Sequence, residues 1–135
     1  MNVVVKHENN VRFCAEARGH RVICDQPLSN NGEDQGMTPP ELLLASLGTC
    51  AAYYAVEYLR TRGFSAEGLE VRVEAEKSPG PARLSQFRIQ VSLPALDERH
   101  QQGVLRAIKS CLIHNTLLNA PAIDVALETT AVAAA

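Results

Sequence analysis

The longest apolar stretch of the chain, residues 38–63 (TPPELLLASLGTCAAYYAVEYLRTRG), constrains the fold more than any other feature. Thr38, two prolines and Glu41 stand in the order of a helix N-cap, a first-turn proline and a capping-box acid. Gly63 follows as a C′ glycine would. Almost every residue between them is apolar or small, so no polar stripe is left to face water. The sequence therefore predicts a central helix over 38–62 that a sheet or a second subunit must cover on most sides.

The rest of the chain shows the two-residue alternation of strands and one further helical pattern. We expect a strand meander over 2–25, a polar loop over 26–37 and a hairpin over 69–93 whose turn is KSPGP. A second helical region is expected over 97–118, and a last strand over 122–128 (AIDVALE). This order predicts one α+β domain over 1–135, with antiparallel sheets around the central helix.

Charge and composition exclude several classes of protein. The 135 residues carry a formal net charge of -2, and no basic run or interleaved aromatic set suggests binding to nucleic acid. The N-terminus lacks the pattern of a signal peptide. The apolar helix is too polar at its ends for a membrane span. We expect a cytoplasmic protein with no membrane partner.

Four cysteines, Cys14, Cys24, Cys50 and Cys111, carry the reactive side chains of interest. No two of them have the close spacing of a zinc site, and a cytosolic compartment disfavours a disulfide framework. We interpret Cys14 and Cys24 as packing residues of neighbouring strands. Cys50 lies in the middle of the central helix, where it is either a buried thiol or a redox group.

Two strings carry a resemblance to a known family. Residues 39–50 (PPELLLASLGTC), followed by residues 109–115 (KSCLIHN), resemble the osmotically inducible protein C and organic hydroperoxide resistance family (OsmC/Ohr), in its OsmC-like branch. The likeness in element order runs from about residue 3 to residue 128. It implies an intertwined homodimer in which the two central helices pack on each other.

The resemblance also implies a function. Cys50 would be the peroxidatic thiol and Cys111 the resolving thiol of a peroxiredoxin-like organic hydroperoxide reductase, an enzyme of the oxidative stress response. It implies alkyl or fatty-acid hydroperoxides as substrates and a dithiol or lipoyl-type carrier as the reductant, with no metal or organic cofactor. Only a thiolate attacks the peroxide, so Cys50 needs a positive neighbour.

The resemblance and the side chains near Cys50 also suggest candidates for the group that activates the thiol and for the substrate-binding residues. The family's thiol is supported by an arginine of the N-terminal hairpin, for which Arg18 is the first choice and Arg12 and Arg21 are alternatives. Glu41 stands one residue later than the family's glutamate, a place that Pro40 occupies here, and it is also explained as a capping residue. The apolar side chains near Cys50 favour an alkyl-bearing substrate; these substrate-binding candidates are Leu43, Leu47, Tyr53 and Tyr54.

Two other functions fit the sequence. The same dimer could bind an apolar ligand without catalysis, with Cys50 as a packing residue. Alternatively, Cys50 could act with His114 in a thiol or acyl transferase. If the protein only binds a ligand, Cys50→Ser should keep ligand binding while no peroxide is consumed. If it is a transferase, covalent labelling by an electrophile should depend on His114 and not on Cys111.

Overall fold

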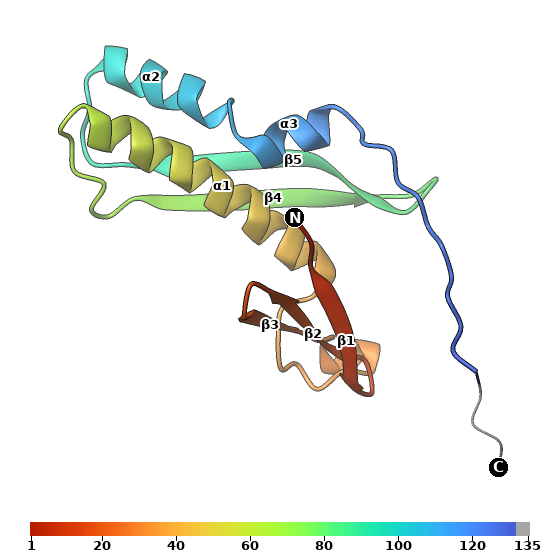
Figure 1. Ribbon diagram of the computed structural model, residues 1–135. Helices are drawn as coiled ribbons and strands as arrows, with labels where there is room; N and C mark the ends of the chain where they lie inside the picture. The colour runs from red at the N-terminus through yellow and green to blue at the C-terminus, as the bar shows by residue number, and fades with distance from the viewer. Residues whose placement is uncertain (132–135) are drawn as a thin grey trace.

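The computed structural model describes residues 1–131 and has the predicted α+β class (Figure 1). A three-stranded antiparallel sheet, ordered β1-β2-β3, is formed by Val4–Asn9, Arg12–Ala17 and His20–Cys24. A short 3₁₀ helix, η1 (Leu28–Asn30), leads to the central helix α1 (Pro39–Thr61). The second sheet is the antiparallel hairpin of β4 (Glu70–Ser78) and β5 (Arg83–Ser92). Two helices follow, α2 (Glu98–Ile108) and α3 (Leu112–Leu118).

The ends of α1 lie within one residue of the predicted ends, because local caps set them. The Thr38 hydroxyl donates a hydrogen bond to the Glu41 carboxylate at 2.8 Å and accepts one from the Glu41 amide at 3.5 Å. Thr38 and Glu41 are the capping pair that the sequence predicts, but the Glu41 carboxylate binds the Thr38 hydroxyl and not the Thr38 backbone amide. At the other end Gly63 has a φ of +74°, the left-handed conformation that glycine adopts without a steric penalty.

One face of α1 forms the core. Leu47, Ala51, Ala55 and Leu59 recur every four residues and are at most 1% exposed. Ala51, Ala55 and Leu59 pack between the β4–β5 sheet and α2, where Val104 and Ile108 complete the buried cluster. Small residues bring the helix close to the sheet, since a Cβ on Gly48 would lie only 3.0 Å from Cγ2 of Val73.

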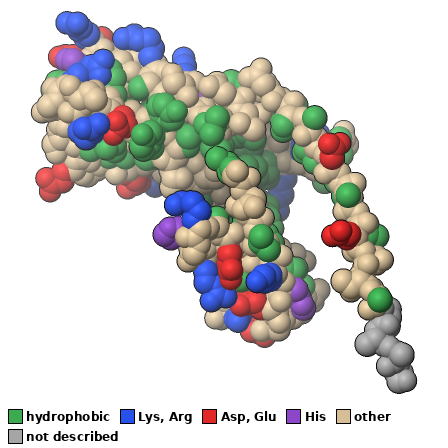
Figure 2. Space-filling model, viewed as in Figure 1, with side chains coloured by type: hydrophobic (Ala, Val, Ile, Leu, Met, Phe, Trp, Pro, Cys, Tyr) green, Lys and Arg blue, Asp and Glu red, His purple; other side chains and the backbone are tan. Residues whose placement is uncertain are grey.

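The other faces of α1 are less covered than the sequence predicts. Tyr53 is 60% exposed, and Leu43 is 37% exposed. In Figure 2 hydrophobic side chains gather along the middle of the visible face, over α1. Within the described chain, α1 is also the one helix long and apolar enough to cross a membrane, judged by length and composition alone. A single chain therefore satisfies only part of the requirement that this helix be covered.

Two C-terminal features differ from the prediction. The helical region over 97–118 is broken in two at Cys111, which takes a non-helical ψ of 130°. The last strand over 122–128 is not formed, and this segment runs away from the body of the chain in Figure 1. Its apolar residues Ile123, Val125 and Leu127 are 79%, 92% and 90% exposed. An alternating segment becomes a strand only where another strand pairs with it, and no strand of the described chain lies beside this one.

The loop between β3 and α1 is organised by one carboxylate. Asp25 is 1% exposed, and it accepts hydrogen bonds from the amides of Gln26 at 2.8 Å, Gln35 at 3.1 Å and Glu33 at 3.3 Å. These bonds, the one from Gln26 foremost, outweigh burial and hold the pKa of Asp25 below its usual range. The ionised form therefore holds the loop together.

We expect Asp25→Asn to loosen this loop at neutral pH. A depressed folded-state pKa gives a stabilisation that is complete above the unfolded pKa of about 3.9 and is lost as the pH falls through the folded value. Amide hydrogen exchange of Glu33 and Gln35 at pH 7 should become faster in Asp25→Asn. The exposed neighbour Asp34 provides the matched control, Asp34→Asn. Equal exchange rates in the two variants would show that Asp25 does not organise the loop.

Candidate active site

The structure brings Cys50 and Cys111 together, although 61 residues separate them in the chain. Cys50 is half-buried in the middle of α1, and Cys111 is fully buried at the break between α2 and α3. The Cys50 side chain lies close enough to the Cys111 thiol to raise its pKa. Both cysteines are free thiols. The arrangement joins two reduced thiols at the centre of the fold.

The environment of Cys111 keeps it protonated. Burial is the largest cause that raises the pKa of the Cys111 thiol, and the neighbouring Cys50 side chain raises it further. The backbone amides of His114 and Ile113 act in the opposite direction without overcoming this effect. The first of these amides donates to the Cys111 sulfur at 3.4 Å, so that Cys111 caps α3. A thiol held in this form is a poor first nucleophile, because attack requires the thiolate.

An apolar pocket of about 620 Å³ lies near the thiol pair: neither cysteine lines it, but residues one helical turn from each cysteine do. Two of the predicted substrate-binding residues, Leu43 and Leu47, line it from α1. Leu43 and Leu47 share one helical face with Cys50, because they precede it by seven and three residues. Ile108 and His114, each three residues from Cys111, line the pocket from the other side.

Several residues of the pocket were not among the sequence candidates. β5 contributes a row of apolar side chains, and Lys109 adds a cation at the wall. The alternation of β5 showed that one of its faces is apolar, but the sequence could not show that this face meets α1 and α3. The β5 residues are Leu84, Phe87, Ile89 and Val91.

The two tyrosines lie elsewhere. Neither Tyr53 nor Tyr54 is among the residues that line this pocket. Their rings pack edge to face, with centroids 5.4 Å apart, and Tyr53 is largely exposed. Within one chain they are therefore surface residues of α1 rather than walls of the pocket.

Glu41 is also remote from Cys50 within one chain. Nine residues of helix correspond to two and a half turns, so Glu41 lies about 13.5 Å along the axis on the opposite side of α1. Its carboxylate is used by the hydrogen bond from Thr38. The capping role is the one that the geometry of the single chain explains.

The candidate arginines lie in the N-terminal sheet, beyond the first turn of α1 and away from the middle of that helix (Figure 1). Arg12 pairs with Glu8 at 3.0 Å, and Arg21 pairs with Glu16 at 3.1 Å. Arg18, in the turn after β2, forms no ion pair with any residue of the described chain and has a positive φ of 52°. One chain alone thus brings no candidate arginine to its own Cys50.

No hydrogen bond joins the His114 ring to Cys50 within the described residues. The His114 backbone amide contacts the Cys111 sulfur, and its ring Nδ1 lies 3.4 Å from the carbonyl oxygen of Lys109. In residues 1–131 no group of three or more His, Cys, Asp or Glu side chains is arranged to hold a metal ion. The reactive side chains that the structure brings together at this site are the two thiols.

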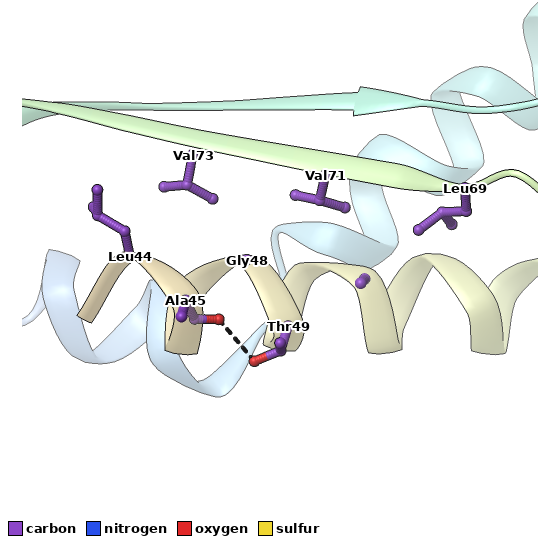
Figure 3. A pocket seen from close by; sticks show the side chains of 8 residues that line it. Leu44, Ala45, Gly48, Thr49, Leu69, Val71 and Val73 are labelled. Carbon is purple, nitrogen blue, oxygen red and sulfur yellow. Dashed lines mark hydrogen bonds between the residues drawn. The ribbon is translucent and has the colours of Figure 1, made fainter. Parts of the chain in front are cut away.

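A second groove of about 360 Å³ lies between α1 and β4 (Figure 3). Val71 and Val73 point from β4 toward the helix at Gly48, and the Thr49 hydroxyl donates to the carbonyl oxygen of Ala45 at 2.9 Å. Cys50 does not line this groove. It is an open flank of α1 rather than part of the thiol site.

The fold and the site together define an α+β protein with a thiol pair beside an apolar pocket. The family model of OsmC-like proteins matches residues 32–126, which include both thiols. The chain therefore belongs to the OsmC-like family, as the sequence resemblance implied. No curated protein sequence matches the chain.

Solved structures show the same fold. A protein from Psychrobacter arcticus, described as an osmotic stress induced and detoxification response protein, is 21% identical and superposes with a TM-score of 0.79, covering 86% of this chain and 87% of its own. An OsmC-like protein from Mycoplasma pneumoniae is 17% identical, with a TM-score of 0.76 and coverages of 88% and 87%. An organic hydroperoxide resistance protein from Legionella pneumophila is 15% identical, with a TM-score of 0.58 and coverages of 88% and 90%.

Proposed function

We propose that this protein is a thiol peroxidase that reduces organic hydroperoxides. The observation that carries the proposal is the proximity of Cys50 to the buried Cys111, one helical turn from residues that line a 620 Å³ apolar pocket. An apolar pocket favours an alkyl or fatty-acid hydroperoxide over hydrogen peroxide, because burying the alkyl chain contributes about 0.8 kcal/mol per methylene. Membership of a family that includes proteins named for hydroperoxide resistance supports the same substrate class.

The proposed cycle uses the two thiols in turn. The Cys50 thiolate attacks the distal peroxide oxygen, the O–O bond breaks, and the alkoxide leaves as an alcohol after taking a proton. Cys50 is then a sulfenic acid. Cys111 attacks its sulfur, water leaves, and a disulfide forms. An external dithiol or lipoyl-type carrier restores both thiols, so the reductant supplies the two electrons that the peroxide accepts. We propose the cytoplasm as its location, because that compartment keeps the thiols reduced.

Activation of Cys50 is assigned to a second subunit. Because Arg18 is remote from Cys50 within one chain and has no ion-pair partner among residues 1–131, it is available to reach the thiol of another copy. We propose a homodimer in which the partner subunit's Arg18 lies beside Cys50 and stabilises its thiolate. In such a dimer the partner subunit would bring further faces of α1 to the site. Glu41 would then position the arginine, and Tyr53 and Tyr54 would complete the substrate site.

The exposed apolar surface supports the homodimer. The open face of α1 and the unpaired segment over 122–128 leave large hydrophobic side chains in water. Contiguous exposed apolar surface of this kind usually marks an interface. A second copy would cover the helix and offer the segment a strand to pair with.

The raised pKa of Cys111 leads to a pH-dependent resolving step. Disulfide formation requires the Cys111 thiolate, so its rate should rise with pH and should not level off before about pH 8.5, the value of an ordinary thiol. Stopped-flow measurement with one equivalent of cumene hydroperoxide, followed by acid quenching and mass analysis, gives this rate. A rate that levels off below pH 7 would contradict the proposed resolving role.

A matched pair of variants identifies the intermediate. In Cys111→Ser the Cys50 sulfenic acid should accumulate and be trapped by dimedone, whereas Cys24→Ser should form the disulfide as the wild type does. If Cys111→Ser forms no adduct, Cys50 is not oxidised. The apolar pocket would then favour the alternative function, a non-enzymatic protein that binds an apolar ligand.

A further inference from the structure

A basic cleft lies on a different face of α2 from the apolar pocket. It has a volume of about 390 Å³ and lies between the C-terminal end of α1 and α2. Arg99, Gly103 and Arg106 line it from one face of α2, while Arg62 lines it from the end of α1. The apolar pocket instead uses Leu105 and Ile108 of the same helix. The two sites are therefore separate.

The positive charge of this cleft is not neutralised by the protein. Within residues 1–131, neither Arg62, Arg99 nor Arg106 forms an ion pair, and no Asp or Glu is among the residues that line the cleft. Lys and Arg side chains gather visibly around α2 and the adjoining end of α1 in Figure 2. Three like charges around one small cleft repel one another, which is unusual in a chain whose formal net charge is -2.

The walls of the cleft are built by specific contacts. The Arg62 guanidinium lies over the Tyr58 ring at 3.7 Å from its centroid, which orients the cation. The Tyr58 hydroxyl lies 3.1 Å from Nδ1 of His100. Gly103 makes this arrangement possible, since a Cβ at that position would overlap the Tyr58 phenol. A glycine inside a helix is destabilising relative to alanine, and the close approach of the tyrosine explains why glycine stands here.

The charged groups around the cleft have partners of their own. His100 is partly buried, and its Nε2 lies 3.9 Å from Asp97, which faces the histidine rather than lining the cleft. Arg60 is occupied by Glu57 at 2.9 Å and is not part of the cleft. Ser110 adds a hydroxyl at the end of α2. The cleft therefore holds three guanidinium groups without an ion-pair partner in residues 1–131, together with the Ser110 hydroxyl.

We propose that this cleft binds a phosphorylated small molecule. Guanidinium groups donate paired hydrogen bonds in a fixed fork that matches the oxygens of phosphate. A phosphate group offers three terminal oxygens and about -1.5 to -2 charges, whereas a carboxylate offers two oxygens and one charge. Three arginines from two helices match the larger and more highly charged group. This inference does not depend on the proposed peroxidase activity.

Inorganic pyrophosphate is the probe that tests the cleft. Isothermal titration calorimetry at 150 mM salt measures its affinity, and acetate is the carboxylate comparison. We expect one saturable site per chain and an affinity for pyrophosphate at least about tenfold above that for acetate. Arg99→Gln with Arg106→Gln should weaken pyrophosphate binding at least about tenfold. The control is Arg72→Gln with Arg88→Gln, which removes the same charge from the β4–β5 hairpin and should leave binding unchanged.

A second variant guards against a loss of folding. Ser110→Asp places a negative charge in the cleft while keeping all three arginines, and it should also abolish pyrophosphate binding, with an unchanged circular dichroism spectrum. Equal weakening by the control pair, equal affinity for acetate, or no saturable binding to the wild type would each overturn the proposal. So would capture of the protein by phosphatidylglycerol vesicles without binding of pyrophosphate, because the partner would then be a membrane surface.

Discussion

Replacing Cys50 with serine is expected to abolish consumption of organic hydroperoxide, with a fall in kcat/KM of at least about 10³-fold. A serine hydroxyl stays protonated at neutral pH and is a weak nucleophile toward peroxide oxygen, so no sulfenic acid can form. The substitution changes one atom at a half-buried position of α1, and it should leave the helix and the pocket in place. A coupled assay with cumene hydroperoxide and dihydrolipoamide measures the loss.

The other cysteines provide the comparison for this result. Cys24 is half-buried in β3, away from the thiol pair, and Cys24→Ser should keep wild-type turnover. Cys111→Ser should consume a first equivalent of peroxide and then turn over slowly, because the disulfide cannot form. Retained turnover in Cys50→Ser would move the peroxidatic role to another group and would remove the basis of the proposed mechanism.

Replacing Ile123, Val125 and Leu127 with serine in one variant is expected to convert a dimer into monomers. Each side chain is at least 79% exposed in the single chain, and pairing with a partner's sheet would bury it. Burial of a large aliphatic side chain contributes about 1.5 kcal/mol or more. Three such side chains in each subunit correspond to an increase in the dimer Kd on the order of 10³-fold or more. Sedimentation velocity at micromolar protein concentration measures this change.

The alternating sequence of this segment supplies a matched control. Serine at Asp124 and Glu128 changes the interleaved polar positions and should leave the sedimentation coefficient that of a dimer. If the wild-type protein sediments as a monomer, the exposed segment is not an interface between copies. The assignment of the partner subunit's Arg18 to Cys50 would then fail as well.

Local signals predicted the central helix well. Thr38, Glu41 and Gly63 mark the ends of α1 in the sequence, and each acts within a few residues of its own position. The break at Cys111 is less visible, because cysteine is an uncommon N-cap and no proline or glycine stands there. A last strand over 122–128 was predicted from alternation alone, but a strand requires a partner that the single chain does not supply.

The candidate site depended more on tertiary structure. The pairing of Cys50 with Cys111 was implied by family resemblance, since nothing in their spacing places two residues 61 positions apart in contact. Leu43 and Leu47 follow from helical periodicity around Cys50, whereas the β5 wall and Lys109 require knowledge of which faces meet. The basic cleft shows the same limit, because Arg62 joins Arg99 and Arg106 only through the packing of α1 on α2.

The central claim is that Cys50 and Cys111 form a redox pair, and intact mass of the reduced protein after one equivalent of alkyl hydroperoxide tests it most directly. The account predicts a loss of about 2 Da in the wild type, reversed by a dithiol, and a gain of one oxygen on Cys50 in Cys111→Ser. An unchanged mass in the wild type would contradict the claim and leave Cys50 as a packing residue beside an apolar pocket.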